Sequence, residues 1–377
     1  MNRSILHLIR TLDPERGGPV TFLKQLSAVH TAMGVQVAIL TLDRNDPAWL
    51  KDLPVSVIEC GPSLSTYGYS ARLERKLTEV AGSFGALVVH GLWQFHGLCA
   101  QRVSARVGVP YFVLPHGMLD PWFRKSYPFK HFKKQLYWVL AERRVLQGAR
   151  SVLFTSENEA RLAKSTFFPT AHYWSRIVPL GVPKAPGNIE PLHEAFLHRF
   201  PHLRRRRFLL FLGRLHPKKG CDLLVRAVAE MRPPVDLLVA GPDVAGEYAR
   251  RLKRLAEGLP ITFAGMLQGE EKLGALVSAD ALILPSHQEN FGMVVAEALS
   301  CGTPALVSEK VSVAEYIRSF GAGFVEPDTL AGTRQLIARW LERGNIGMRT
   351  AALNCFQKHF DIEYCAGELR EILLGDG

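Results

Sequence analysis

The amino-acid sequence predicts an α/β protein made of two doubly wound domains. Short aliphatic runs alternate with amphipathic stretches of helical length along most of the chain, which is typical of parallel sheets covered by helices. The 377 residues amount to about two and a half times the ~150 residues of an average domain. An irregular, proline-rich stretch interrupts the alternation near the middle and predicts a linker between the domains.

The first domain is predicted over residues 1–183. Its strands are expected in six aliphatic runs bounded by turn residues, a pattern that indicates strands buried on both faces. These runs are 5–12, 35–42, 55–61, 86–91, 111–115 and 151–155. Helices are expected between them, with clear amphipathic patterns at 19–33, 70–82 and 129–147.

The linker is predicted over residues 184–206 and the second domain over residues 207–377. In the second domain the alternation resumes, and six further runs predict strands. They are 208–213, 235–240, 261–263, 281–284, 305–308 and 323–325. The last helical stretch, 348–374, either completes the second domain or sends its final helix back onto the first, and the pattern allows both.

Composition excludes several classes of protein. With 47% hydrophobic and 21% charged residues, the chain has enough apolar side chains for large cores, which excludes disorder and fibrous repeats. No apolar run approaches the ~18 residues that span a bilayer, and the N-terminus is too charged for a signal peptide, so we expect a cytoplasmic protein. The six cysteines lack any paired spacing, and we expect them reduced.

The net charge of +11 belongs almost entirely to the first half of the chain. Residues 1–180 hold 22 Lys and Arg against 12 Asp and Glu, whereas residues 181–377 hold 24 against 23. Within residues 121–150, bases alternate with aromatic and aliphatic residues, a pattern typical of helices that lie on an anionic membrane surface. The bases expected to contact such a surface or an acceptor are Lys130, Lys133, Lys134, Arg143 and Arg144. A solvated helix face is the alternative; nucleic acid is not expected, because no binding module is present.

Functional residues are expected where strands end. The carboxyl ends of parallel strands form the ligand-binding edge of an open α/β sheet, and two such domains would face a central cleft. Gly17 and Gly18 follow the first strand and precede a helix that Pro19 suits as a first-turn residue. Adjacent glycines let the backbone approach a ligand, and a helix N-terminus offers unpaired N–H groups to an anion.

The segment 213–220 connects a strand to a helix and carries two bases that predict a diphosphate site. Arg214 can contact an anion as a planar fork and Lys219 as a point charge. A solvated basic loop is the alternative interpretation, but its place at a strand end favours binding. His216 and Lys218 in the same loop are interpreted as surface residues.

The segment 285–297 again runs from strand through loop to helix. Glu289 and Glu297 are spaced to contact two parts of one extended ligand, because a carboxylate can accept hydrogen bonds from vicinal hydroxyl groups. The backbone N–H groups of Asn290, Phe291 and Gly292, at the start of the helix, would supply further donors.

Two histidines follow strands of the first domain. His116, before Gly117 at the end of a predicted strand, is expected to project toward a reacting group. His90, at the end of the preceding strand, is a competing candidate that ranks second. A single histidine in such a place is otherwise structural.

Over nearly its whole length the sequence resembles the retaining, nucleotide-sugar-dependent family 4 glycosyltransferases of the GT-B fold. The motifs that carry the resemblance are Gly17-Gly18, His116-Gly117, Gly213-Arg214 with Lys219-Gly220, and Glu289-Asn290-Phe291-Gly292 with Glu297-Ala298. The segment 115–122 is similar to that of bacterial members that build exopolysaccharide, capsule or lipopolysaccharide. Asn290 stands where the family usually has glycine, a departure that bears on the identity of the donor sugar.

The resemblance implies a role for each matching residue. The first domain would bind the acceptor and the second the nucleotide sugar, with Arg214 and Lys219 on the diphosphate, Glu297 on the ribose and Glu289 on the donor sugar. Gly17 and Gly18 would lie near the phosphates and the acceptor, and His116 beside the transferring sugar. The chain has no Asp-x-Asp motif to hold a divalent ion, so we expect no cofactor and no metal, with the two bases neutralising the leaving diphosphate.

The expected activity is the transfer of a sugar from a UDP- or GDP-sugar to a lipid-linked or cell-surface saccharide, at the inner face of the cytoplasmic membrane. Two alternatives stay open: a nucleotide-sugar epimerase of the same fold, and a non-catalytic, basic, membrane-associated module that binds nucleotides. Turnover that requires an acceptor would separate the first activity from both. A dehydrogenase is disfavoured because the spaced triple-glycine fingerprint is missing after the first strand.

Overall fold

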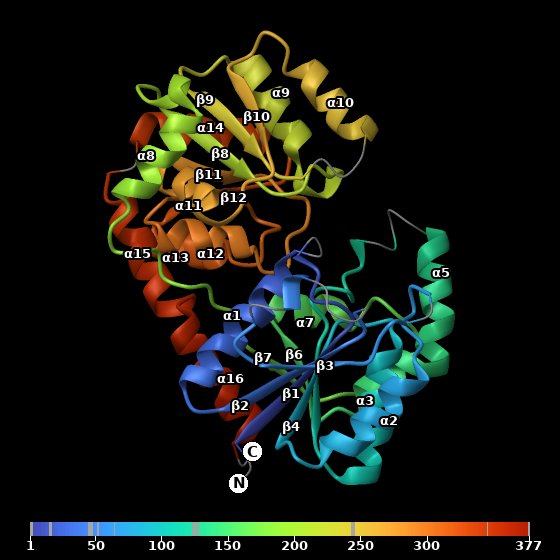
Figure 1. Ribbon diagram of the computed structural model, residues 1–377. Coiled ribbons are helices and arrows are strands. Elements are labelled where there is room, and N and C mark those ends of the chain that lie inside the picture. Colours follow the sequence, from blue (N-terminus) through green and yellow to red (C-terminus); the bar gives the residue numbers. More distant parts are fainter. Residues whose placement is uncertain are drawn as a thin grey trace. The chain divides into compact units, whose positions relative to one another are not determined.

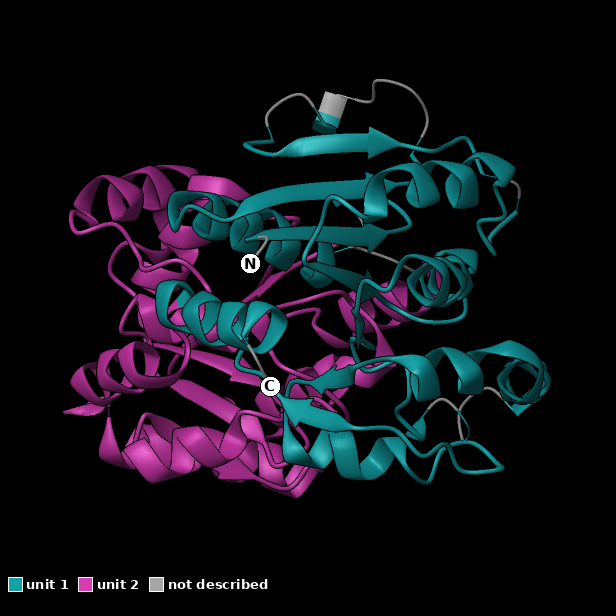
Figure 2. Cartoon of the chain, turned by 90° about the horizontal axis from the view of Figure 1, so that it is seen from below, with its two compact units in different colours: residues 1–181, 362–377 teal, residues 182–361 magenta. Residues whose placement is uncertain are grey.

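In the computed structural model the chain forms two compact units, each with its own parallel sheet (Figures 1 and 2). Unit 1 comprises residues 1–181 and 362–377, and unit 2 comprises residues 182–361. The structure describes residues 3–14, 17–43, 48–50, 53–63, 65–122, 124, 128–242, 246–344 and 346–375. Two doubly wound α/β domains, the predicted fold class, are therefore confirmed.

The sheet of unit 1 has the strand order β3-β2-β1-β4-β5-β6-β7. The strands are β1 (Ser4–Ile9), β2 (Gln36–Thr41), β3 (Ser56–Glu59), β4 (Ala86–His90), β5 (Tyr111–Leu114), β6 (Ser151–Phe154) and β7 (Ser175–Ile177). The first six coincide with the predicted runs. Strand β7 was not predicted, because its three residues are all exposed and form no aliphatic run.

The helices of unit 1 are α1 (Gly18–Ala32), α2 (Ala71–Ala81), α3 (Phe95–Val107), α5 (Pro128–Tyr137), α6 (Arg143–Gly148), α7 (Glu157–Ala163) and α16 (Ile362–Leu374). The single helix predicted over 129–147 is instead α5, a π-helical segment (Trp138–Glu142) and α6. The core of unit 1 is formed by aliphatic side chains from β1, β2, β4, β5 and β6 together with those of α2 and α3.

The sheet of unit 2 has the order β10-β9-β8-β11-β12-β13. Its strands are β8 (Phe208–Leu212), β9 (Asp236–Ala240), β10 (Ile261–Gly265), β11 (Ala281–Leu284), β12 (Ala305–Ser308) and β13 (Gly323–Glu326). Its helices are α8 (Glu190–Arg199), α9 (Cys221–Met231), α10 (Gly246–Leu255), α11 (Gly269–Ser278), α12 (Met293–Ser300), α13 (Ala314–Phe320), α14 (Leu330–Arg343) and α15 (Met348–His359). All six predicted strands are present.

Residues 184–206, predicted as a linker, contain helix α8 and a 3₁₀ turn (Pro201–Leu203) and belong to unit 2. The prolines do not break this helix, because Pro191 lies in its first turn and Pro201 lies beyond its end. Helix α8 packs closely on α11: a Cβ added at Gly274 would lie 2.5 Å from the carbonyl oxygen of Leu192. The boundary between the units therefore falls at residue 182.

The final helical stretch is divided between the two units. Helix α15 belongs to unit 2, whereas α16, which begins at Ile362, belongs to unit 1 and packs on α1 (Figure 1). The Nε2–H group of His30 on α1 donates a hydrogen bond to the carbonyl oxygen of Ala366, 2.9 Å away. Of the two arrangements left open by the sequence, the structure has the one in which the last helix crosses back.

Each sheet is wound in both directions from its first strand. In unit 1, β1 lies between β2 and β4; in unit 2, β8 lies between β9 and β11. The loops that follow β1 and β4, or β8 and β11, diverge at the carboxyl edge of the sheet, where open α/β sheets bind ligands. Gly17, Arg214, Lys219 and Glu289 lie in such loops, whereas His116 follows β5 and Glu297 lies within α12.

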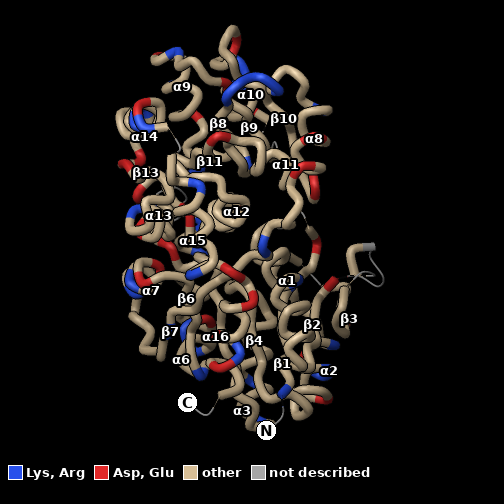
Figure 3. Tube along the Cα trace, turned by 90° about the vertical axis from the view of Figure 1, so that its left-hand side faces the viewer, with Lys and Arg blue, Asp and Glu red and all other residues tan. Residues whose placement is uncertain are grey.

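Basic residues are unevenly distributed in unit 2. Figure 3 shows a run of Lys and Arg along α10, formed by Arg250, Arg251, Lys253 and Arg254. The near-neutral charge of the second half conceals this helix, because acidic residues elsewhere balance it.

Candidate active site

Two loops of unit 2, one after β8 and one after β11, contact each other through their backbones. The chain winds in opposite directions from these two neighbouring strands, and we call this place the β8/β11 switch point. Gly220 has a φ of +66°, and a Cβ atom added there would lie 2.1 Å from the carbonyl oxygen of Pro285. The N–H group of His287 donates to the carbonyl oxygen of Lys218 at 2.9 Å. Glycine is required at position 220 for this close approach. The contact brings together the loop that carries Arg214 and Lys219 and the loop that carries Glu289.

Lys219 and Glu289 form an ion pair across the two loops, and each side chain is 15% exposed. Burial, followed by the positive charges of Lys218 and Arg214, lowers the pKa of the Lys219 ammonium to about 7. The Glu289 carboxylate acts in the opposite direction and favours the charged form. The site therefore holds a partly desolvated cation that an incoming anion can approach.

The backbone of Glu289 is fixed by the loop that follows β12. Its N–H group donates to the carbonyl oxygen of Lys310 at 3.2 Å, and its carbonyl oxygen accepts from the N–H and hydroxyl groups of Ser312, each at 3.1 Å. These bonds hold the backbone of Glu289 in place, and its side chain points to Lys219.

Glu297 lies in the second turn of α12 and is paired with a lysine that was not predicted from the sequence. Lys272 Nζ, on α11, lies 2.7 Å from Glu297 Oε1. No local spacing marks Lys272, because it precedes Glu297 by 25 residues and lies on another helix. Both candidate carboxylates of unit 2 are therefore charge-balanced and can still accept hydrogen bonds.

Two helices at this edge begin on glycines without a side-chain cap. Gly220 precedes α9, and Gly292, with a φ of +80°, precedes α12. In the first turns, the N–H group of Asp222 donates to the Tyr248 hydroxyl at 3.2 Å, and those of Leu223 and Val295 donate to the carbonyl oxygens of Gly220 and Gly292. Among the described residues, the N–H groups of Cys221, Met293 and Val294 are left for an anion. Arg214 is exposed, and among the described residues no carboxylate pairs with it.

Other residues of the segments 213–220 and 285–297 make contacts that support the structure of the loops. Phe291 is buried and packs edge-on against Phe360, with ring centroids 5.8 Å apart, so only its backbone can contact a ligand. The amide of Gln288 donates to the side-chain oxygen of Asn290. His216 accepts at Nδ1 from the N–H group of Lys218, 3.1 Å away, and thereby shapes the turn.

In unit 1, Gly17 caps α1 with a φ of +81°, and helix α1 begins at Gly18. An added Cβ atom at Gly17 would meet no atom of the described residues within 4 Å. The preceding loop is fixed by a buried carboxylate that was not predicted from the sequence. Asp43 accepts hydrogen bonds from the N–H group of Leu12 at 2.7 Å, from the Thr41 hydroxyl at 2.8 Å, and from the Thr11 hydroxyl.

His116 follows β5 in a left-handed backbone conformation, with a φ of +49°. The next N–H group, that of Gly117, donates to Glu159 Oε1 at 2.8 Å, and Glu159 Oε2 accepts from the backbone and hydroxyl of Thr155. Nε2 of His116 lies 3.0 Å from Nδ1 of His90, so the two competing histidines are in direct contact. Burial lowers the pKa of His116 to about 4.

The basic stretch of unit 1 presents an apolar stripe to solvent. None of the residues of α5 is buried, and Phe129 and Phe132 are 88% and 73% exposed. Leu136 and Leu140 continue the stripe. Residues 123 and 125–127 of the predicted stretch lie outside the described residues.

The five predicted bases differ in their surroundings. Lys130, Lys133 and Arg144 are exposed. Lys134 is half-buried over the Trp93 ring, 5.0 Å from its centroid, and Arg143 is also half-buried. Lys130 and Lys133 therefore share the exposed helix with the apolar stripe, whereas Lys134 packs inward.

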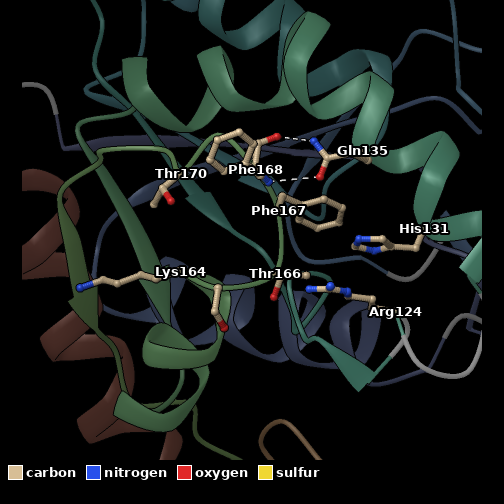
Figure 4. A pocket seen from close by; sticks show the side chains of 9 residues that line it. Arg124, His131, Gln135, Lys164, Thr166, Phe167, Phe168 and Thr170 are labelled. Atoms are coloured by element: carbon tan, nitrogen blue, oxygen red, sulfur yellow. Dashed lines mark hydrogen bonds between the residues drawn. The ribbon is translucent and has the colours of Figure 1, made fainter.

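A cavity of about 350 Å³ lies between α5 and the segment that follows α7 (Figure 4). His131 stacks on Phe167 at its edge, with ring centroids 4.8 Å apart, and the Gln135 side chain bonds both backbone groups of Phe168. Figure 4 shows Lys164 directed away from Arg124 and His131, so the bases around the cavity do not converge.

Within the described ranges, no helix is long and apolar enough to cross a membrane. In the same residues, no three His, Cys, Asp or Glu side chains gather as metal ligands. All six cysteines are buried, and no disulfide bond joins any of them.

Two protein-family models match the chain, one for each half. The model described as a glycosyl transferase 4-like domain matches residues 17–181, and that of the glycosyl transferases group 1 matches residues 196–350. Among curated proteins, a GDP-mannose-dependent alpha-(1-6)-phosphatidylinositol dimannoside mannosyltransferase of Mycobacterium tuberculosis is 35% identical over 138 residues. That match covers 35% of this chain and 35% of the relative, so it spans about a third of either protein.

Solved structures match over the full chain at low identity. The structure of Anabaena HepE in complex with UDP and glucose has a TM-score of 0.74 at 18% identity, and the match covers 98% of this chain and 99% of that one. WaaG, described as a glycosyltransferase involved in lipopolysaccharide biosynthesis, has a TM-score of 0.71 at 17% identity, over 99% and 100% of the two chains. These likenesses show a shared fold.

Proposed function

The chain belongs to the GT-B glycosyltransferases that combine a glycosyl transferase 4-like domain with a domain of the glycosyl transferases group 1. From that membership we propose that it transfers a sugar from a nucleotide-sugar donor to a saccharide acceptor. The observation that supports the donor site is the junction of the two loops at the β8/β11 switch point. It unites Lys219, Glu289 and an exposed Arg214 beside two glycine-capped helix starts.

The donor is proposed to be a UDP- or GDP-sugar. The relative from M. tuberculosis is named as GDP-mannose-dependent, and the HepE structure contains UDP. In our proposal Arg214 and Lys219 bind the diphosphate, while the Glu297 carboxylate, which is paired with Lys272, accepts hydrogen bonds from the ribose. Glu289 accepts hydrogen bonds from hydroxyl groups of the sugar.

We propose a reaction that retains the anomeric configuration. The bond between the anomeric carbon and the diphosphate oxygen breaks, and a bond from the acceptor oxygen to that carbon forms on the same face. The acceptor proton passes to an oxygen of the leaving diphosphate. Negative charge grows on that leaving group, and the two bases can stabilise it without a metal ion.

Thermal unfolding tests the donor site. We expect UDP or GDP, at 100 times its dissociation constant, to stabilise the protein by about 2.7 kcal/mol, which corresponds to a shift of several degrees. Arg214→Ala should abolish that shift because a charge-assisted contact to the diphosphate is lost. Arg343→Ala, an exposed arginine in the last turn of α14, is the matched control and should keep it. If neither nucleotide stabilises the native protein, the donor site is wrongly assigned.

Turnover separates transfer from the alternatives. With the nucleotide sugar that stabilises the protein, we expect release of the nucleoside diphosphate to depend on an added saccharide or lipid-linked saccharide, and to continue in the presence of a chelator. An isomerised sugar formed without acceptor would instead support an epimerase. Binding without any turnover across acceptors would support the nucleotide-binding module.

We further propose that the lipid-linked acceptor is met at an anionic membrane surface, where α5 lies. The apolar stripe supplies apolar contact with the membrane, and Lys130 and Lys133 supply attraction to anionic headgroups, worth about 1 kcal/mol for each base. This proposal rests on α5 itself and can fail independently of the donor site.

A further inference from the structure

Three imidazoles of unit 1, two buried and one half-buried, form a continuous row across adjacent strands. His7 lies in β1, His90 ends β4, and His116 follows β5; these three strands are neighbours in the sheet. Nδ1 of His7 lies 2.9 Å from Nε2 of His90, and Nδ1 of His90 lies 3.0 Å from Nε2 of His116. His7 is fully buried and His90 is 3% exposed. His116, at the outer end, is the one of these three rings that is partly exposed at the carboxyl edge of the sheet.

All three rings are neutral at neutral pH. Burial is the main cause that lowers the pKa of each, to about 3 for His7 and about 4 for His116, and well below the ordinary value for His90. A neutral imidazole carries one N–H donor and one bare acceptor nitrogen. Two hydrogen bonds along a row of three such rings can therefore run in only two ways, with every ring donating outward or every ring donating inward.

The inner end of the row distinguishes these two ways. Nε2 of His7 is buried and has no hydrogen-bond partner in the described part of the chain. Inward donation would place an N–H group at this atom, whereas outward donation leaves a bare nitrogen there. Among backbone groups, a buried N–H without an acceptor is rarer than a buried carbonyl oxygen with an unused lone pair, and we apply the same preference to the imidazole nitrogen. Outward donation is therefore favoured, from His7 to His90 and from His90 to His116.

We propose that His90 and His7 are positioning residues that keep His116 in its Nδ1–H tautomer, so that His116 donates a hydrogen bond to a substrate oxygen and does not act as a base. Its Nε2 lone pair already accepts from His90, and its Nδ1 carries the proton. Among the described residues nothing bonds to Nδ1 of His116, which leaves that N–H group for a ligand. Only the identity of the ligand, a sugar hydroxyl or a phosphate oxygen, rests on the proposed function.

The tautomer can be measured without any substrate. In the full-length protein labelled with ¹⁵N, a protonated and a bare imidazole nitrogen have different chemical shifts, and the signals of His116 are identified by their loss in His116→Asn. We expect Nδ1 to be protonated and Nε2 to be bare at pH 7. Protonation at Nε2 would overturn the proposal, whatever the activity of the protein.

Substitutions of His90 test its positioning role. The amide nitrogen of Asn can take the place of the Nδ1 donor, so His90→Asn should preserve the His116 tautomer. His90→Phe, which cannot donate, should give a mixture of the two tautomers. Thermal unfolding of both variants shows whether they are folded. An unchanged tautomer in a folded His90→Phe protein contradicts the role of His90.

A matched pair at His116 separates a donor from a base. Asn and Asp have the same shape and both tolerate the left-handed backbone found here, but only Asn donates a hydrogen bond from its side chain. We expect His116→Asn to keep a tenth or more of kcat, and His116→Asp to lose about 100-fold or more, as when a donor to a developing oxyanion is removed. A more active Asp variant would identify a base. If no transfer activity exists, the proposed function fails while the tautomer measurement still stands.

Discussion

At the scale of single residues, two opposing effects act on the charge of the Lys219 side chain. Burial and the neighbouring bases Arg214 and Lys218 disfavour its charge, and the Glu289 carboxylate favours it. Such a pair adds little net stability, because desolvation of both ions offsets their attraction. Its value in our proposal is functional: the carboxylate keeps a cation in place where a diphosphate would bind.

Removing one partner of this pair should therefore cost more stability than removing both. Lys219→Met leaves the Glu289 carboxylate partly buried without its cation, and we expect a loss of about 1–3 kcal/mol in the free energy of unfolding. The double variant Lys219→Met/Glu289→Gln should recover most of that loss, yet still fail to bind the nucleotide. Denaturant unfolding and nucleotide titration of the same three proteins measure both effects. A double variant that regains nucleotide binding would show that Lys219 does not contact the ligand.

The residues that the sequence could identify are those that follow strands directly. Arg214, Lys219 and Glu289 stand in strand-to-helix loops, where the alternation of elements already predicts a ligand-binding edge. Glu159 and Lys272 could not be identified in this way, because each acts on a residue of another element that is distant in sequence. Glu159 binds the Gly117 N–H group across 42 residues, and no spacing rule relates those two positions.

At the scale of elements, the helix predicted over 129–147 contains a π-helical segment that turns a carboxyl group into the core. Glu142 ends this segment, is 1% exposed, and accepts from the N–H group of Trp93 at 2.9 Å. Burial raises the pKa of Glu142 to about 8. Sequence periodicity could not reveal the segment, because one wider turn hardly changes the apolar pattern of a helix.

The shift at Glu142 predicts a definite dependence of stability on pH. Because its folded pKa lies above its ordinary value of 4.5, the folded state binds this proton more tightly, and stability falls as the pH rises from 4.5 through 8. Glu142→Gln keeps an acceptor for Trp93 and removes the titration. Thermal unfolding at both pH values gives the stability of the variant minus that of the native protein. We expect this difference to be more favourable to the variant at pH 8.5 than at pH 5. Glu157→Gln, an exposed control on α7, should show no such gain.

Helix α5 leads to a prediction about membrane binding. Lys130→Glu/Lys133→Glu should weaken binding to vesicles rich in anionic lipid by at least tenfold, because each base near the surface contributes about 1 kcal/mol and reversal adds repulsion. Lys134 is left unchanged because it packs on Trp93. Arg250→Glu/Arg251→Glu on the basic helix α10 changes the net charge equally. An equal loss in this control would mean that overall charge, rather than α5, drives binding.

At the scale of the whole molecule, the alternation of strands and helices was enough to predict both sheets apart from the edge strand β7. It was not enough to assign the last helix. Helices α15 and α16 are both amphipathic and meet at Phe360 and Asp361, yet they belong to different units. An apolar stripe shows that a helix is covered on one face, but not which surface covers it.

The assignment of α16 to unit 1 makes a prediction about local stability. Leu369 is buried in α16, on the helix whose backbone accepts the His30 hydrogen bond from α1, so Leu369→Ala should cost about 2–5 kcal/mol within unit 1. In hydrogen exchange followed by mass spectrometry, we expect amides of α1 to exchange faster and those of α9 to be unchanged. The exposed neighbour Glu368→Ala should alter neither helix. Faster exchange in α9 instead would mean that α16 stabilises unit 2, because a cavity weakens first the elements that line it.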